Sequence, residues 1–423
     1  MNSIFNSIPL PALSSASEYD CGRDSYMLKY TPCTKADFDA YCEKVTAAGF
    51  VLHSAWDIRN NYHKTFIGQI LLHIYYCESE KTLRVVADPN TTLFQPSELP
   101  CPRTHQTTLW QFEVDHALID CGMCYIVRCC DGSFFVIDSA HPYSVNDDIR
   151  LCDFLWKLNG GRKPTVAGWF ISHGHEDHTG KAMDIIEYSA DRLDIKTVYY
   201  NFPSFNHRDS HLWGKAHENF NRRFERLMDS RPDIKKIRLH TGQRFFVGNL
   251  QFEVLCTHED VFPNSCHDFN NTSTALLMTA EGSKVLFPGD CSAESDKVLV
   301  RRYGDYIKCD VVQISHHGHS GTSPQFYRNA AAECALFPIT VIKYDEEWPR
   351  QESNRVAVEI AKEFHIASNG TVEIPLPYVY GNTKVHPDET FEDFNGIFNL
   401  WTYEYTDERK EQLRREFEER SKK

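Results

Sequence analysis

The feature that most constrains this chain is the segment His173-Gly-His175-Glu-Asp177-His178, which directly follows the apolar run 168–172. Three imidazoles and two carboxylates, all side chains that can bind a cation, fall within these six residues. A strand can deliver such a turn to the edge of a sheet, where several side chains enter one volume. Imidazole nitrogen and carboxylate oxygen suit zinc, iron and manganese. The segment therefore predicts a metal site, with a histidine-rich solvated loop as the alternative.

Length and composition indicate a globular protein with several domains. The chain has 423 residues, 41% of them hydrophobic and 25% charged, and this length predicts two or three domains. The longest apolar stretch, 66–77, contains Gln69 and His73, so we expect no membrane-spanning helix. We also expect no signal peptide, because no basic region precedes the first apolar residues. The 15 cysteines lack framework spacing, which indicates reduced thiols in the cytoplasm.

The charge of the chain bears on its partners. The formal net charge is −14, and an acidic surface repels nucleic-acid backbones. This excess of acidic residues disfavours a nuclease, with a local basic groove as the alternative. We therefore expect a small-molecule substrate and no membrane partner, and a homo-oligomer stays an open alternative.

Residues 1–104 are expected to form a small α+β domain of unknown role that ends in a linker. Residues 1–20 are rich in Ser and Pro and are expected to be poorly ordered. Thr34 is expected to cap an amphipathic helix, because Phe38, Tyr41 and Val45 then share one face. Strands are expected at 51–56, 65–77 and 82–87.

Residues 105–385 are expected to form a larger domain, and residues 386–423 a C-terminal extension. Strands are expected at 109–114, 123–130, 133–137, 164–172, 197–201, 244–247, 251–256, 273–279, 284–287 and 310–315, and helices at 147–158 and 181–190. Strands with helices outside them indicate two sheets packed face to face, each covered by helices. In the extension, 407–423 predicts a charged, solvated helix.

Three more predicted strands end in side chains of the same kinds. Asp138 follows one strand, Asp290 follows another after a Gly turn, and the pair His316-His317 follows a third. A single Asp at such a place is commonly a turn former. Four such strand ends in one region indicate instead that they meet at one site.

The order of these residues resembles that of the metallo-β-lactamase superfamily: Asp138, His173-x-His175-x-Asp177-His178, Asp290 and His316-His317. The runs 287–292 and 314–318 are most similar to the ComEC-type and phosphorylcholine-esterase-like branch. The resemblance covers roughly residues 105–385. It implies an α+β fold, an αββα sandwich with a one- or two-metal site at one rim of the sheets, preceded by the small N-terminal domain.

The resemblance also implies metal ligands. His173 and His175 would bind the first metal, and Asp177 and His178 the second. Asp290 would bridge both. Two divalent ions are expected, zinc first, with manganese and iron as alternatives.

Further roles follow from the same resemblance. One of His316 and His317 would complete the second metal site, and the other would hydrogen-bond a phosphate or leaving group; the sequence leaves open which does which. Asp138 would orient a ligand imidazole through its other nitrogen.

Two departures from the family pattern concern the pocket. Most members supply a third histidine to the first metal from a loop between the two halves, where this chain offers His258 and His267 as candidates. The nearby run 270–273, which contains Asn271, matches the branch without that histidine. In addition, His319 follows Gly318 where the similar sequences tend to have serine.

The implied reaction is hydrolysis by a metal-bound hydroxide. Metal binding lowers the pKa of water from about 16 to about 7, and Asp177, His316 or His317 would shuttle the proton. Phosphoesters or phosphodiesters are the expected substrates. The alternatives are a lactonase or β-lactam-type amidase on the same dinuclear site and a non-catalytic scaffold on the same fold.

Substrate contacts are expected from the aromatic and histidine-rich segment 199–213. It contains His207, His211 and Trp213, and loops of this kind commonly carry binding residues. Asn271 is a further candidate. An ordinary aromatic loop packed on the sandwich is the alternative for the segment.

Overall fold

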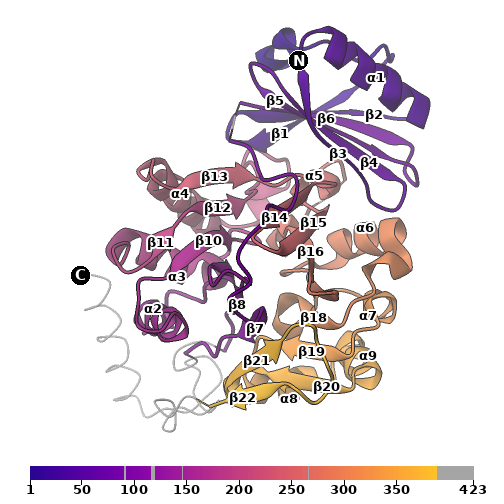
Figure 1. Ribbon diagram of the computed structural model, residues 1–423. Coiled ribbons are helices and arrows are strands. Elements are labelled where there is room, and N and C mark those ends of the chain that lie inside the picture. Colours follow the sequence, from indigo (N-terminus) through magenta and orange to yellow (C-terminus); the bar gives the residue numbers. More distant parts are fainter. Residues whose placement is uncertain (90–91, 116–119, 145, 265, 388–423) are drawn as a thin grey trace.

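The structure, a computed structural model, describes residues 1–89, 92–115, 120–144, 146–264 and 266–387. In these residues the strands form a six-stranded, a nine-stranded and a seven-stranded sheet. Figure 1 shows the six-stranded sheet above the other two, which face each other and carry helices on their outer sides. The predicted helix at 407–423 lies outside the described residues.

The N-terminal sheet is covered on one face by α1 (Lys35–Ala47). Its strands are, in spatial order, β1 (Ser17–Gly22), β2 (Ser25–Tyr30), β6 (Thr82–Asp88), β5 (Leu71–Cys77), β4 (Asn61–Ile67) and β3 (Val51–Asp57). The side chain of Thr34 accepts a hydrogen bond from the Asp37 backbone N–H, and the Asp37 carboxylate accepts one from the Thr34 N–H. This capping box starts the helix, and Phe38 is buried beneath it. The predicted helix is confirmed.

Two expectations for the N-terminal residues are wrong. Residues 1–20 were expected to lack order, yet Ser3–Ser7 form a 3-10 turn whose Phe5 is buried in the core of this sheet. Their order comes from long-range packing, which local composition does not reveal. The strand expected at 65–77 is a hairpin, because the chain turns at Gly68, where a Cβ would clash with the Phe50 ring.

The first sheet of the sandwich has nine strands and is covered on its outer face by α2 (Asp147–Leu158), α3 (Glu176–Tyr188) and α4 (Lys215–Asp229). Its strands are β13 (Lys235–Arg238), β12 (Thr197–Tyr200), β10 (Thr165–Phe170), β9 (Phe134–Asp138), β8 (Cys124–Arg128), β7 (Thr108–Gln111), β21 (Thr371–Pro375) and β22 (Lys384–His386), with β11 (Asp194–Ile195) beside β10.

The second sheet has seven strands and packs its outer face against α6 (Ala293–Tyr303), α7 (Pro324–Ala330) and α9 (Glu352–Ile360). Its strands are β14 (Arg244–Val247), β15 (Leu250–Cys256), β16 (Ala275–Ala280), β17 (Ser283–Phe287), β18 (Val311–Gln313), β19 (Cys334–Phe337) and β20 (Glu363–Ile366). Two short helices, α5 (His258–Val261) and α8 (Val341–Glu347), lie in its connections.

One apolar core joins the two sheets. Phe135 of β9 meets Phe252 of β15 with ring centroids 4.3 Å apart, and Tyr125 of β8 meets Phe287 of β17 at 5.4 Å. The predicted αββα sandwich is therefore confirmed, with the N-terminal sheet preceding it. Every helix in the described ranges is too short or too polar to traverse a lipid bilayer.

The strand directions bring the predicted site together. β9 and β10 run parallel in one sheet, and β17 and β18 run parallel in the other. Parallel neighbours end at the same edge, so the turns after them share one rim. Asp138, His173, Asp290 and His316 all stand at or just after these four strand ends.

Candidate metal centre

The helix after β10 begins inside the histidine motif. The predicted start was residue 181, but α3 begins at Glu176, and His175 is its N-cap residue. The earlier start fixes Asp177 and His178 on the first turn of a helix. Gly174 allows the close approach of α4, because a Cβ there would clash with Asn221, whose amide donates to the Gly174 carbonyl at 2.7 Å.

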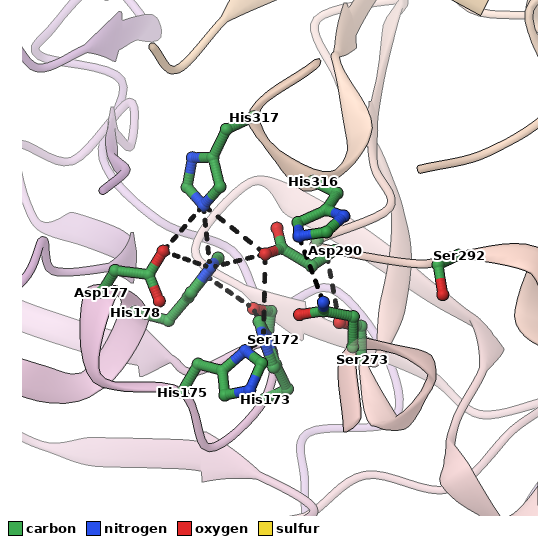
Figure 2. A network of polar contacts seen from close by, with 12 residues as sticks. Ser172, His173, His175, Asp177, His178, Ser273, Asp290, Ser292, His316 and His317 are labelled. Carbon is green, nitrogen blue, oxygen red and sulfur yellow. Dashed lines mark hydrogen bonds and ion pairs between the residues drawn. The ribbon is translucent and has the colours of Figure 1, made fainter. Parts of the chain in front are cut away.

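One set of ligand atoms comes from both halves of the sandwich. Asp177, His178, Asp290 and His317 each place one such atom within 4.8 Å of all the others. The Nε2 of His178 lies 3.1 Å from an Asp290 carboxylate oxygen, and the Nε2 of His317 lies 2.9 Å from one of Asp177. Figure 2 shows these side chains pointing into one volume. We call them the second set.

A first set adjoins it and consists of His173, His175 and Asp290. The Nε2 of His173 lies 2.9 Å from the Nδ1 of His175 and 3.9 Å from an Asp290 oxygen. Asp290 thus belongs to both sets. This is the position that a bridging carboxylate between two cations would need.

The residues fit a pair of divalent cations. In the first set two imidazole nitrogens face each other at 2.9 Å, which requires a proton or a cation between them. The Oδ1 of Asp290 is buried and has no hydrogen-bond partner among the described residues. A buried carboxylate oxygen without a partner is costly. Imidazoles and carboxylates around such an oxygen match the ligands of zinc and related metals.

In two of these rings the Nδ1 atom, which points away from the centre, is hydrogen-bonded to another part of the protein. Asp138 accepts from the Nδ1 of His178 at 2.9 Å, and Asp138 itself accepts from the Ser172 backbone N–H at 2.8 Å. The Nδ1 of His317 donates to the Pro338 carbonyl at 2.9 Å. Each ring therefore directs its Nε2 to the centre, as in carboxylate–histidine–metal arrangements. Asp138 thus lies directly behind the ring of His178.

The backbone decides between the two neighbouring histidines. His316 and His317 both have positive φ, 51° and 55°, and such residues persist only where the surroundings hold them. His317 joins the second set, whereas the Nε2 of His316 lies 3.1 Å from the Asn270 side-chain nitrogen. His316 thus stands beside the centre, and Figure 2 shows its ring turned toward a different partner from that of His317.

The two sets differ in their charge. Burial lowers the pKa of His175 to about 4 and that of His173 well below its usual value, so both rings are neutral. Burial also opposes charge on His317, but Asp290 and Asp177 outweigh it and raise its pKa to about 10. The pKa of His178 is raised for the same reason, by Asp290 and then Asp177. Without a cation, the second set therefore holds protons between its carboxylates.

The candidates for a third ligand of the first metal lie elsewhere. His258 is buried, but its Nε2 contacts the Asn201 side-chain oxygen at 3.0 Å and it belongs to neither set. His267 is exposed. Asn271 is also engaged elsewhere, because its side-chain oxygen accepts from the Ser295 backbone N–H at 2.9 Å and so holds the start of α6.

The predicted substrate residues of segment 199–213 do not point into the two sets. His207 stacks on Phe262, with ring centroids 4.3 Å apart. Trp213 is buried and donates its indole N–H to the Cys266 carbonyl at 2.7 Å. His211 is exposed. In the described residues this segment therefore packs largely as the aromatic loop that was the alternative interpretation.

No sequence motif marks two neighbours of the first set. The ring of His217, on α4, lies 4.5 Å from that of His175, and its Nδ1 is buried without a partner among the described residues. The Phe269 ring lies 4.8 Å from that of His175. A lone histidine on a helix and a lone phenylalanine in a loop have no motif spacing, so only the fold reveals them.

Comparisons with known proteins relate the chain to a family. The family model described as "Metallo-beta-lactamase superfamily" matches residues 121–342, which include both sets. Over 201 residues the chain is 25% identical to ComE operon protein 3 of Bacillus subtilis (strain 168). That match covers 47% of this chain and 23% of the relative, so the chain spans less than a quarter of that relative's length.

Solved structures with similarity to the chain include three proteins of low sequence identity. The metallo-beta-lactamase fold protein YhfI from Bacillus subtilis is 12% identical, and the match covers 62% of this chain and 97% of that chain with a TM-score of 0.38. The diiron beta-hydroxylase CmlA from Streptomyces venezuelae is 13% identical, with 66% of this chain and 55% of that chain covered and a TM-score of 0.39. The short form of human tRNase Z is 14% identical, with 54% of this chain and 90% of that chain covered and a TM-score of 0.33. Because the family model matches more than half of the 423 residues, the chain belongs to the metallo-beta-lactamase superfamily.

Proposed function

We propose that this protein is a hydrolase that holds two divalent cations, zinc by preference, and cleaves phosphoesters or phosphodiesters. Asp290 carries this proposal, because its carboxylate is shared by both ligand sets and its Oδ1 is buried without a hydrogen-bond partner among the described residues. His173 and His175 would hold one cation with Asp290. Asp177, His178 and His317 would hold the other with the same carboxylate. Bound there, the cations would lower the pKa of a water molecule and neutralise charge on the substrate.

The side chains beside the two sets have separate tasks. Asp138 keeps His178 in one tautomer and one orientation through the contact at its Nδ1. His316 is half-buried at the rim, where its Nε2 faces Asn270. We assign to His316 a contact with a substrate oxygen, either on the phosphoryl group or on the leaving group. Asp177, which accepts from His317, is placed to take up the proton that hydrolysis releases.

The phosphoester part rests on the similarity of the runs 287–292 and 314–318 to the ComEC-type and phosphorylcholine-esterase-like sequences. The net charge of −14 supports a small substrate in preference to a nucleic acid. All 15 cysteines are free thiols, which supports a reducing compartment such as the cytoplasm.

A substrate panel tests the proposal. The zinc- or manganese-loaded protein is assayed with bis(p-nitrophenyl) phosphate, p-nitrophenyl phosphate, a homoserine lactone and nitrocefin. We expect turnover of a phosphoester that falls at least 100-fold in Asp290→Ala and is unchanged in Asp345→Asn, which alters an exposed carboxylate. Turnover of only the lactone or nitrocefin would overturn the phosphoester assignment. A metal-loaded protein without any turnover would favour the scaffold.

A further inference from the structure

A second cluster of imidazoles is buried where the N-terminal sheet meets the sandwich. It consists of His63 on β4, His73 on β5, Asp88 at the end of β6, and His240 in the turn between β13 and β14. Each of these residues is at most 2% exposed. We call them the interface cluster. The turn approaches closely because Gly242, with φ 89°, lies against the side chain of His63, where a Cβ would be 2.9 Å away.

The rings of the interface cluster are stacked. The rings of His73 and His240 lie 4.0 Å apart at an angle of 26°, and those of His63 and His73 lie 6.1 Å apart at 21°. His73, Asp88 and His240 each offer a ligand atom within 4.8 Å of the other two. Two imidazoles and a carboxylate thus converge from two different sheets, none of them belonging to the ligand sets described above.

Several nitrogens in the interface cluster lack partners. Both ring nitrogens of His63 and the Nε2 of His73 are buried without a hydrogen bond among the described residues. Buried polar atoms are normally hydrogen-bonded, so three unpartnered nitrogens in one cluster are consistent with a bound ligand. A cavity of about 10 Å³ lies against these rings, and this volume is about the room that one water-sized particle needs.

His240 is held as a metal-binding histidine would be. Its Nδ1 contacts the Glu259 carboxylate at 2.7 Å, and Glu259 also accepts from the Asn201 side-chain nitrogen at 3.0 Å. The Nε2 of His240 is then directed at Asp88, 3.4 Å away. A carboxylate on the outer nitrogen fixes tautomer and orientation, and it is the common companion of a histidine that binds zinc.

We propose that the interface cluster is a metal site, separate from the candidate centre, that takes a zinc-like divalent cation. His73, Asp88 and His240 supply three ligands, and the ring of His63 lies beside that of His73. Buried imidazole nitrogen and carboxylate oxygen atoms are ligands of the kinds that zinc prefers. The Nδ1 of His73 lies 3.2 Å from Thr65 Oγ1 and 3.0 Å from the Gln243 side-chain nitrogen, so Nε2, which has no partner among the described residues, is the ligand atom of this ring.

Such an ion would join two parts of the chain. Two of its ligands come from the N-terminal sheet and one from the sandwich, so binding links β5 and β6 to the turn that carries His240. Because the interface cluster shares no residue with the two catalytic sets, this site does not depend on the proposed function.

The experiment measures bound metal in the full chain. A background variant, His173→Ala with His317→Ala and Asp290→Ala, removes both catalytic sets. It is saturated with zinc, freed of loose metal by dialysis and analysed by mass spectrometry of the element. We expect the background variant to keep one equivalent of zinc and to lose it when His73→Ala is added. His53→Gln, which alters a nearby histidine outside the cluster, is expected to leave the equivalent in place.

Asp88→Asn keeps the size of the side chain and guards against a variant that fails to fold. In the same background we expect it to weaken zinc binding at least tenfold, while circular dichroism shows an unchanged fold. Zinc should also raise the unfolding temperature of the background variant, and this rise should vanish with Asp88→Asn. A folded background variant that keeps no zinc and shows no rise would overturn the proposal and leave a buried water as the occupant.

Discussion

The Nε2 atoms of His178 and His317 lie 3.3 Å apart, although 139 residues separate these histidines in the sequence. Each ring is held from behind, His178 by Asp138 and His317 by the Pro338 carbonyl. Both nitrogens therefore face the same carboxylates of Asp177 and Asp290 (Figure 2). A cation in this position would take the place of the protons that the rings otherwise carry.

The two neighbouring histidines should differ in their effects. His317→Ala removes a member of the second set, so we expect the protein to lose one equivalent of metal and nearly all turnover. His316→Ala removes only a side chain beside the centre. We expect it to keep the metal and to lower turnover about 10- to 100-fold. Metal analysis and kinetics of both variants check this, and equal metal loss in both would contradict the assignment.

Loading of the second set should depend on pH. His317, whose pKa is raised to about 10, carries a proton at neutral pH in the metal-free protein, and the cation must displace it. Its affinity should thus rise as the pH rises toward 10, up to tenfold per unit for each proton released.

The first set should behave differently under the same conditions. The pKa of His175 is lowered to about 4, so its ring is already neutral and no proton is displaced above about pH 5. Zinc titrations against a competing chelator between pH 6 and 9 should therefore give one pH-dependent and one nearly constant affinity. Two affinities that change in parallel would contradict the charges assigned to the two sets.

Asp138→Asn tests the support behind His178. The amide keeps the size of the side chain but removes the charge that faces the His178 Nδ1 at 2.9 Å. Loss of such a carboxylate typically weakens metal binding 10- to 100-fold. We expect this loss in the second set and little change in the first, measured by zinc titration. Asp345→Asn, on the surface, serves as the matched control.

A buried ion pair in the sandwich lies next to the N-terminal sheet, because its Arg302 also contacts Glu80 between β5 and β6. The side chains of Arg302 and Asp260 are both 0% exposed and 2.7 Å apart. Arg302→Gln leaves Asp260 without this cation, and breaking a buried pair destabilises a protein by about 3–5 kcal/mol.

The neighbouring arginine supplies the control. Arg301 and Arg302 both contact Glu80, but the side chain of Arg301 is 54% exposed, so Arg301→Gln should change the free energy of unfolding by less than about 1 kcal/mol. Urea denaturation of both variants measures the difference. Equal changes in the free energy of unfolding for the two substitutions would contradict the role of burial at Arg302.

Much of the candidate metal centre follows from the sequence, because strand ends can be recognised and parallel strands end together. Asp138, His173 and Asp290 could be placed at one edge on that basis alone. The capping box at Thr34 likewise located α1, since it is a local interaction.

Other features depend on distant contacts that no local pattern encodes. Which of His316 and His317 joins the second set depends on the backbone at these two residues, whose positive φ angles are held by the surrounding fold. The order of Phe5 comes from packing against the N-terminal sheet. His217 and His240 meet their partners only after segments remote in the sequence have come together.

The most direct test of the metal centre is a crystal structure of the zinc-loaded protein with anomalous diffraction data. Two anomalous peaks are expected on either side of the Asp290 carboxylate, each about 2.0–2.2 Å from its ligand atoms. One should contact His173 and His175, and the other His178 and His317. A zinc-saturated crystal without a peak at coordination distance from Asp290 would contradict the account.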